Sequence, residues 1–493
     1  MSPQSLVLAA VVMPLVTAVL VAACGRRPNL RETVTLVSGG LLLGVVCLLV
    51  GSVDARPEVN VIDVIPGSFD RPAISIGFHV EPLGVLFALV ASGLWIVTSV
   101  YAIGYMRGHG EQNQTRFFAC FAVAIAAVMG IAFSRNLLTL FLFYEVLTLS
   151  TYPLVTHHGT EAAKRAGRTY LGILMGTSVV GLLLAILWTW QLAGTLEFRV
   201  GGILDGHVEP VTAGVLLALF AFGTGKAALM PLHRWLPAAM VAPTPVSALL
   251  HAVAVVKAGV FTILKVGVYI FGTDLLSSSG ASVWLMYVAG ASLLTASLIA
   301  LTRDNLKERL AYSTISQLAY IVLGVALATR SGVIGSGMHI VMHAFGKITL
   351  FFCAGAILIA AHKTRVSELD GLGRRMPWTF AAFSVGALSV IGLPPVGGSW
   401  SKWFLALGTV EAGQWPLLGA LMISSLLNIA YLVPIPLRAF FRDAPPGVGG
   451  DEETGGEAPV ACVVPLCLTA SGCVVLFFCA DPIYQFLLSV TVN

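Results

Sequence analysis

Residues 244–271 read TPVSALLHAVAVVKAGVFTILKVGVYIF, and this stretch decides the fold class. It is long enough to cross the hydrocarbon core of a bilayer, which requires about 20 apolar residues. Within it lie His251, Lys257 and Lys265, and no acid. A charge near the bilayer centre costs several kcal/mol. The stretch therefore predicts a membrane helix whose basic side chains face protein or water rather than lipid.

The whole chain has the composition of a membrane protein. Of its 493 residues, 57% are hydrophobic and 11% are charged, and the mean hydropathy is +0.90, whereas soluble domains carry about 25% charged residues. The net charge of +4 is too small and too scattered for a nucleic-acid surface. The eight cysteines include no CxxC pair, which argues against iron–sulfur, zinc or disulfide frameworks. No basic region precedes the first apolar stretch, so it is expected to be a span rather than a cleaved signal.

Fourteen apolar segments are long enough to cross the membrane. They are expected to be helices, because backbone polar groups in lipid must be satisfied within the segment. The segments are 5–23, 33–53, 82–104, 116–134, 136–155, 166–192, 211–232, 244–271, 281–301, 309–328, 335–361, 378–408, 414–441 and 460–480. We therefore expect an all-α polytopic membrane protein of about 14 transmembrane helices.

The distribution of Lys and Arg over the loops predicts the orientation. With the N-terminus outside, 18 of these residues fall in cytoplasmic loops and five in outer loops. The outer five are Arg56, Arg71, Arg135, Arg199 and Arg330. We expect a protein of the cell's inner (plasma) membrane with both termini on its outer face. The loop at 442–459 is rich in Gly and Pro and is expected to be mobile and cytoplasmic. Its acids are Asp443, Asp451, Glu452, Glu453 and Glu457.

Apart from the 23 lysines and arginines counted with the loops, five lysines, three histidines and one glutamate lie inside the predicted spans. They are Glu145, Lys226, His251, Lys257, Lys265, His339, His343, Lys347 and Lys402. For Lys265, near the outer end of its span, snorkelling to the interface is an alternative to function. For Glu145, the only acid in any span, a structural ion pair is the alternative. Lys226, Lys257 and Lys402 lie too far inside their spans for snorkelling.

Helical spacing groups several of these side chains. His339, His343 and Lys347 follow one another at intervals of four and form one stripe within about 80° of arc. His251 and Lys265 are fourteen residues apart and are also expected to share a face. Buried lysines can lose a proton and histidine titrates near neutral pH, so such a string is what a proton relay requires. Each histidine taken singly has the alternative of a satisfied core residue.

Proline interrupts two spans beside a lysine. Pro231 follows Lys226, and Pro394-Pro395 precede Lys402. Proline removes a helical hydrogen bond and frees carbonyl groups. The two broken spans are the seventh and the twelfth, and a spacing of five, an odd number, implies an inverted repeat.

The predicted organisation follows from these breaks. It comprises helices 1–3 in residues 1–115, two five-helix units in 116–271 (helices 4–8) and 281–441 (helices 9–13), the loop 442–459, and a final helix with its tail in 460–493. No GxGxxG after a strand, P-loop or HExxH motif is present, so no cofactor or metal is predicted. With one carboxylate in the spans, a carboxylate cage for Na⁺ is not evident, although carbonyls and hydroxyls are still able to bind Na⁺.

Five segments resemble the antiporter-like membrane subunits shared by Mrp-type cation/proton antiporters, respiratory complex I and membrane-bound hydrogenases. They are NLLTLFLFYEVLTLSTY (136–152), GKAALMPLHRWLPAAMVAPTPVSALLHAVAVVKAGVF (225–261), DNLKERLAYSTISQLAYI (304–321), HIVMHAFGKITLFFCAGAI (339–357) and LPPVGGSWSKWF (393–404). The resemblance covers about residues 80–440. It implies that a glutamate on the fifth helix pairs with a lysine on the broken seventh. It also implies that the eighth helix relays protons and that the broken twelfth completes the path. The matching positions are Glu145, Lys226, His251 with Lys257, and Lys402, with His339, His343 and Lys347 as the polar stripe of the eleventh helix.

The resemblance leaves two functions open. The chain looks like the D subunit of Mrp antiporters or the M and N subunits of complex I, because no long lateral-helix extension follows the last span. It is therefore expected to be the proton-translocating subunit of a Na⁺/H⁺ antiporter, or the proton-pumping subunit of an NADH–quinone oxidoreductase or hydrogenase complex whose partners move the electrons. A structural scaffold is a third interpretation, which the buried charges oppose. The expected partners are other membrane subunits, protons, Na⁺ and lipid, with no nucleic acid.

Overall fold

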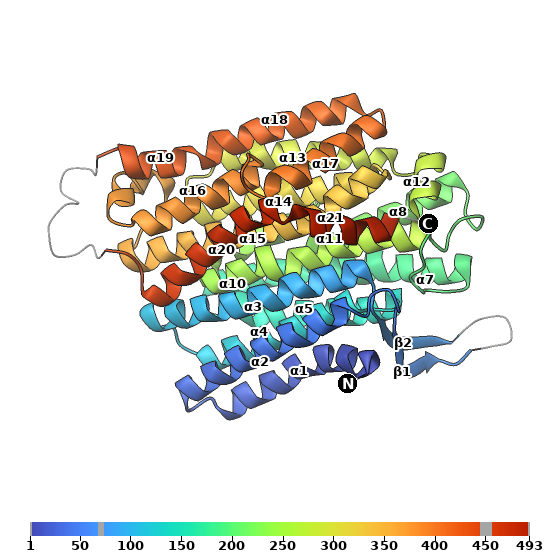
Figure 1. Ribbon diagram of the computed structural model, residues 1–493, viewed down its shortest axis with the longest axis horizontal. Coiled ribbons are helices and arrows are strands. Elements are labelled where there is room, and N and C mark those ends of the chain that lie inside the picture. The colour runs from blue at the N-terminus through green and yellow to red at the C-terminus, as the bar shows by residue number, and fades with distance from the viewer. Residues whose placement is uncertain (1, 68–72, 444–455, 492–493) are drawn as a thin grey trace.

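The helices of the computed structural model, which describes residues 2–67, 73–443 and 456–491, run roughly side by side (Figure 1). The first part of the chain forms α1 (Pro3–Ala23), α2 (Pro28–Val50), α3 (Pro82–Gly108), α4 (Gln114–Ala132), α5 (Leu137–Val155), α6 (Glu161–Thr177), η1 (Ser178–Leu182), α7 (Leu183–Ala193) and α8 (Pro210–Gly223). Shorter pieces follow: η2 (Gly225–Ala227), α9 (Trp235–Ala238), η3 (Ala239–Val241), α10 (Thr244–Ala248), η4 (Leu249–Val253), α11 (Val255–Val266), η5 (Gly267–Phe271) and α12 (Thr273–Ser279).

The second part of the chain is again mainly long helices. These are α13 (Val283–Thr302), α14 (Leu306–Ala326), α15 (Arg330–Ala361), η6 (Val366–Glu368), η7 (Leu372–Arg374), α16 (Pro377–Ile391), α17 (Gly398–Glu411), α18 (Trp415–Leu432), α19 (Pro434–Phe441), α20 (Val460–Phe478) and α21 (Ala480–Thr491). Here η1, η4 and η5 are π-helical and η2, η3, η6 and η7 are 3₁₀ turns.

The described residues contain 11 helices that are long and apolar enough to cross a membrane, and α8 and α16 are shorter apolar helices. The other predicted spans correspond to α8, to α16 together with α17, and to α14, whose first turn carries three charged residues after Leu306, namely Lys307, Glu308 and Arg309. The polytopic helical fold is confirmed. The count of fourteen and the inverted repeat stay predictions.

A β-hairpin between α2 and α3 departs from the purely helical expectation. β1 (Glu58–Ile65) pairs antiparallel with β2 (Ile74–His79). The register runs from Glu58↔His79 through Val59↔Phe78, Asn60↔Gly77, Ile62↔Ile76 and Asp63↔Ser75 to Ile65↔Ile74. The β-branched residues of EVNVIDVI favour a strand. The hairpin projects from the end of the bundle where both chain termini also lie (Figure 1).

The central element is α15, which is buried over most of its 32 residues. It packs against α14, α16, α17, α20, α10 and α3. Glycines allow these close approaches, because a Cβ at Gly335 would lie 2.8 Å from the backbone nitrogen of Leu405 on α17. The helix with the predicted polar stripe therefore lies in the interior.

Only the ends of the predicted acidic loop belong to the described residues. Asp443 pairs with Arg374 at 3.1 Å, and the Glu457 carboxylate accepts a hydrogen bond from the backbone nitrogen of Trp378 at 2.6 Å. Asp451, Glu452 and Glu453 lie outside the described residues, as does Arg71. The mobility and the sidedness of this loop stay predictions.

Candidate functional site

The seventh predicted span is broken at Lys226. Helix α8 ends at Gly223, and Lys226 sits in the following 3₁₀ turn with a fully buried side chain. The break rests on α11, where a Cβ at Gly259 would lie 2.3 Å from the backbone nitrogen of Ala227. The Trp235 indole donates a hydrogen bond at 3.0 Å to the Gly225 carbonyl, which also accepts one from the backbone nitrogen of Ala228. Glycine at 259 and tryptophan at 235 thus make this irregular backbone tenable inside the protein.

The Lys226 ammonium binds to α5 rather than to a carbonyl of its own helix. Its Nζ donates to the Tyr144 carbonyl at 2.8 Å and to the Thr148 hydroxyl at 2.6 Å. It also lies 3.1 Å from the centroid of the Tyr144 ring, within the range of a cation–π interaction. The carbonyl that binds the Lys226 ammonium therefore belongs to the residue that directly precedes Glu145 in the chain.

The Glu145 carboxylate is buried, and neither of its oxygens has a hydrogen-bond partner in the part of the chain that the structure describes. No ion pair joins it to Lys226 among those residues, so the pairing that the resemblance implies is not closed here. An unsatisfied buried polar group costs about 1–3 kcal/mol, and more when it is charged. A carboxylate in this position gains hydrogen bonds by binding water or by turning toward Lys226.

A hydrogen bond joins the eighth and eleventh predicted spans. Lys257 Nζ on α11 lies 2.8 Å from His343 Nδ1 on α15, and both side chains are buried. The His343 ring stacks on the His339 ring, with 5.7 Å between centroids. His339 Nδ1 lies 2.9 Å from the Ser401 hydroxyl on α17. One polar line thus runs from α11 across α15 to the residue next to Lys402.

Lys402 lies at the second helix break, as the Pro394-Pro395 pair predicts. Helix α16 ends at Ile391, Gly392 has a φ of +88°, and α17 begins at Gly398. Lys402 Nζ donates to the freed Ile391 carbonyl at 3.0 Å and to the Ser425 hydroxyl at 3.2 Å. Its ammonium lies 4.6 Å from the Tyr320 ring centroid. Here, unlike at Lys226, the freed carbonyl does bind the neighbouring ammonium.

Lys347 extends the α15 stripe toward α14. Its Nζ donates to the Ser313 hydroxyl at 2.6 Å and to the Leu310 carbonyl at 3.3 Å. The Tyr431 hydroxyl also donates to Ser313, at 2.8 Å. Lys347 therefore forms a branch separate from the line through His343 and His339.

His251 lies apart from these hydrogen bonds. It sits in the π-helical turn η4 with a fully buried ring 4.5 Å, centroid to centroid, from Phe351. Neither ring nitrogen has a partner among the described residues. The prediction that His251 and Lys265 share a face assumed a regular helix. The turn η4 and the irregular Ala254 (φ −117°, ψ −76°) remove that basis.

The snorkelling interpretation of Lys265 is wrong. Its side chain is fully buried, pairs with Glu81 at 2.8 Å and donates to the Ser134 carbonyl at 2.7 Å. Glu81 precedes α3 directly, just outside the predicted span, and is itself buried. A second buried acid, Glu32, lies in the first turns of α2 and pairs with Arg31 and Arg107. The expectation that Glu145 is the only acid inside a span therefore needs correction, because α2 begins five residues before the predicted boundary.

Sequence reasoning also missed a hydroxyl cluster. Ser297, Ser316 and Ser424 lie within 2.9–3.3 Å of one another through their hydroxyl oxygens. The Tyr320 hydroxyl donates to the Leu421 carbonyl nearby on α18. Serine is ordinary in membrane helices, so composition gives no signal for such a cluster. Within the described ranges, no group of three or more His, Cys, Asp or Glu is arranged to hold a metal ion.

Sequence comparison assigns the chain to a family. The family described as "NADH:quinone oxidoreductase/Mrp antiporter, TM" matches residues 134–428, and "NADH-Ubiquinone oxidoreductase (complex I), chain 5 N-terminus" matches residues 68–118. The chain therefore belongs to the family of proton-translocating, antiporter-like membrane subunits shared by NADH:quinone oxidoreductases and Mrp antiporters.

Individual relatives come from different complexes. The chain is 32% identical to NADH-quinone oxidoreductase subunit N of Desulforudis audaxviator over 82% of each chain. It is 31% identical to hydrogenase-4 component B of Escherichia coli over 82% of this chain and 62% of that one. Its fold matches a chain of the Mrp complex from Dietzia sp. with a TM-score of 0.86 and 23% identity, covering 100% of this chain and 98% of that one. A chain of an archaeal membrane-bound sulfane sulfur reductase matches with a TM-score of 0.84 and 23% identity, covering 99% and 98%.

Proposed function

We propose that this chain is the proton-translocating subunit of a multisubunit monovalent cation (Na⁺)/H⁺ antiporter. The observation that carries the proposal is the buried polar line from Lys257 through His343 and His339 to Ser401 and Lys402. It joins the two predicted repeats through the interior, where a scaffold would have no need of charge. The proton-carrying residues are Glu145, Lys226, His251, Lys257, His339, His343, Lys347 and Lys402.

The central step is a transfer between Lys257 and His343. A proton on Lys257 Nζ moves along the 2.8 Å hydrogen bond to His343 Nδ1, which leaves a neutral amine and an imidazolium. The imidazolium then releases the proton from Nε2, which has no protein partner among the described residues. Water is needed from there to His339 and Lys402, because stacked rings do not share a hydrogen bond.

Glu145 controls the proton on Lys226 by its charge. An ionised Glu145 stabilises the nearby ammonium, since opposite charges attract strongly in a poorly hydrated interior. When Glu145 takes up a proton, that stabilisation ends and Lys226 releases its own proton toward Lys257. The membrane potential supplies about 2.3 kcal/mol per charge per 100 mV to drive such movement.

A second candidate is the proton-pumping membrane subunit of an NADH–quinone oxidoreductase or hydrogenase complex. It is favoured by the likeness to subunit N, which extends over most of both chains. In both candidates the chain works with other membrane subunits, and the same side chains carry the proton. The two differ in whether proton movement is coupled to Na⁺ exchange or to electron transfer.

The proposed orientation places the chain in the plasma membrane with the basic loops in the cytoplasm and both termini outside. Cysteines introduced one at a time at Ser2 and Lys363 test it in intact cells, in a background without the exposed Cys47 and Cys479. A membrane-impermeant thiol reagent is expected to label the first and not the second. Labelling of both, or of the second alone, would overturn the orientation.

Everted vesicles containing the assembled complex test the function. Glu145→Ala is expected to abolish proton movement, whereas Glu161→Ala, on the exposed start of α6, leaves it unchanged. A pH change driven by a Na⁺ gradient without NADH supports the antiporter, and one that requires NADH or hydrogen supports the second candidate. Full transport by Glu145→Ala would refute both.

A further inference from the structure

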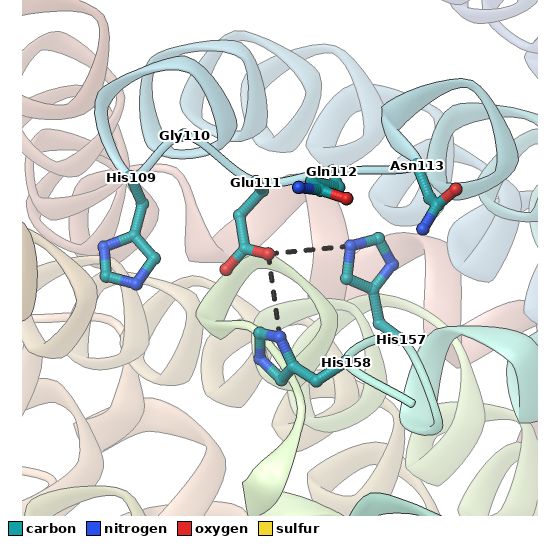
Figure 2. A pocket seen from close by; sticks show the side chains of 7 residues that line it. All are labelled: His109, Gly110, Glu111, Gln112, Asn113, His157 and His158. Carbon is teal, nitrogen blue, oxygen red and sulfur yellow. Dashed lines mark ion pairs between the residues drawn. The ribbon is translucent and has the colours of Figure 1, made fainter. Parts of the chain in front are cut away.

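A pocket of about 330 Å³ opens at the end of the bundle opposite the hairpin, where α3 and α5 end. Its lining comes from two turns and consists of His109, Gly110, Glu111, Gln112, Asn113, His157 and His158. Figure 2 shows the Glu111 carboxylate pointing between the rings of His157 and His158, with His109 to one side. We call this the histidine–glutamate pocket. None of these residues takes part in the site described above.

The three central side chains differ in their access to water. Glu111 Oε2 lies 3.7 Å from His157 Nε2 and 3.6 Å from His158 Nδ1. The side chains of His157 and Glu111 are only 2% and 8% exposed, whereas that of His158 is 36% exposed. The Glu111 carboxylate, which is almost buried, therefore lies directly behind the His158 imidazole, which water reaches.

The two histidines of the pocket differ in burial and in the charges around them. Burial, together with the positive charges of Arg116 and His158, lowers the pKa of His157 to about 4. His157 is therefore neutral near pH 7 and positions Glu111. The Arg116 guanidinium donates to the backbone carbonyl of His157 at 2.9 Å and holds that residue in place. Of the two side chains paired with Glu111, His158 is the one that water reaches.

Lys307 connects the start of α14 with the segment that precedes α10. It stands in the first turn of α14, and its Nζ donates to the Ala242 carbonyl at 2.6 Å. Burial lowers the pKa of Lys307 to about 7, and the negative charge of Glu111 opposes that shift. Ala242 begins the segment that leads through α10 to His251, whose ring nitrogens have no partner. Lys307 thus connects the charge of Glu111 with the segment that leads to His251.

We propose that the histidine–glutamate pocket is the proton-collecting site of this subunit, exchanging protons between the aqueous phase and Lys307 and His251. The inference rests on the proposed function. A proton from water binds the His158 imidazole, the partly exposed ring closes the 3.6 Å gap to hydrogen-bond distance, and the proton passes from Nδ1 to the Glu111 carboxylate, leaving a neutral imidazole and a carboxylic acid. The acid releases it inward through water to a neutral Lys307 amine or His251 nitrogen. Charge is conserved at each step, and the reverse sequence serves release.

Proton movement in everted vesicles, measured in weak buffer, tests the pocket in the assembled complex. Glu111→Gln and His158→Gln are expected to slow transport several-fold relative to the matched surface control Glu161→Gln. Added imidazole, which carries protons itself, is expected to restore most of the rate. A purely structural loss would not respond to imidazole. His158→Gln alters a partly exposed side chain, so it tests the pocket even where Glu111→Gln fails to assemble.

The outcomes separate this proposal from the proposed function. If Glu145→Ala abolishes transport while His158→Gln and Glu111→Gln match Glu161→Gln in weak buffer, the collecting site is wrong and the relay stands. A slowed rate that imidazole does not restore also overturns the collecting site. If Glu145→Ala transports fully, the proposed function itself fails.

Discussion

We predict that variants of the hydrogen-bonded pair Lys257 and His343 lose transport whether or not they lose stability. His343 Nδ1, at 2.8 Å, is the only hydrogen-bond partner of the Lys257 ammonium in the part of the chain that the structure describes. The lysine is fully buried. In His343→Ala the ammonium stays in the interior without that partner, whereas Lys257→Met removes the charge and keeps a long apolar side chain.

The magnitudes follow from the cost of an unpaired buried charge. A hydrogen bond to a charged group contributes about 1.5–3 kcal/mol, and stranding a buried charge costs about 3–5 kcal/mol. His343→Ala should therefore lower the free energy of unfolding by about 2–4 kcal/mol. Lys257→Met should leave it unchanged or raise it, because burying an apolar group needs no partner. The double variant should recover most of the loss of the single His343→Ala.

The assay combines unfolding and transport on the same preparations. Unfolding in detergent is followed with a dye that reacts with thiols, in the background without the exposed Cys47 and Cys479, because Cys353 and Cys473 are buried and become reactive on opening. Proton movement is measured in vesicles. All three variants should lose most transport, including the stable Lys257→Met and the recovered double variant. Transport by Lys257→Met, or a double variant less stable than His343→Ala, would refute the assignment.

Two further predictions concern the other buried lysines. Lys226→Arg and Lys402→Arg should assemble yet lose most transport, because arginine keeps the charge but does not release a proton at accessible pH; the exposed Lys164→Arg serves as the control, and equal transport by all three would contradict a relay. Glu81→Gln should lower the free energy of unfolding by about 3–5 kcal/mol, because it leaves the Lys265 ammonium without its counter-ion. Lys265→Met with Glu81→Gln should recover part of that loss, and a single Glu81→Gln that unfolds like the wild type would show that the pair is unimportant.

Much of the site was visible in the sequence because charge is rare in membrane helices. Lys226, Lys257, Lys347 and Lys402 stand out against apolar runs, and the prolines beside two of them correctly predicted where helices break. The four-residue spacing likewise placed a stripe along α15, which is a regular helix throughout. These inferences needed only the period of the helix and the cost of burying a charge.

The tertiary structure decided which groups meet. The bond between Lys257 and His343 joins residues 86 positions apart, and Lys265 finds its counter-ion in Glu81, far away in the chain. The π-helical turn at His251 could not be read from the sequence, because its apolar flanks suit a regular helix equally well. The sequence by itself determined which spans carry charge and where they break, since the bilayer penalises every exception to an apolar helix. The partners depended on how those helices pack, because a buried ammonium is satisfied by whichever acceptor the neighbouring helix brings within about 3 Å.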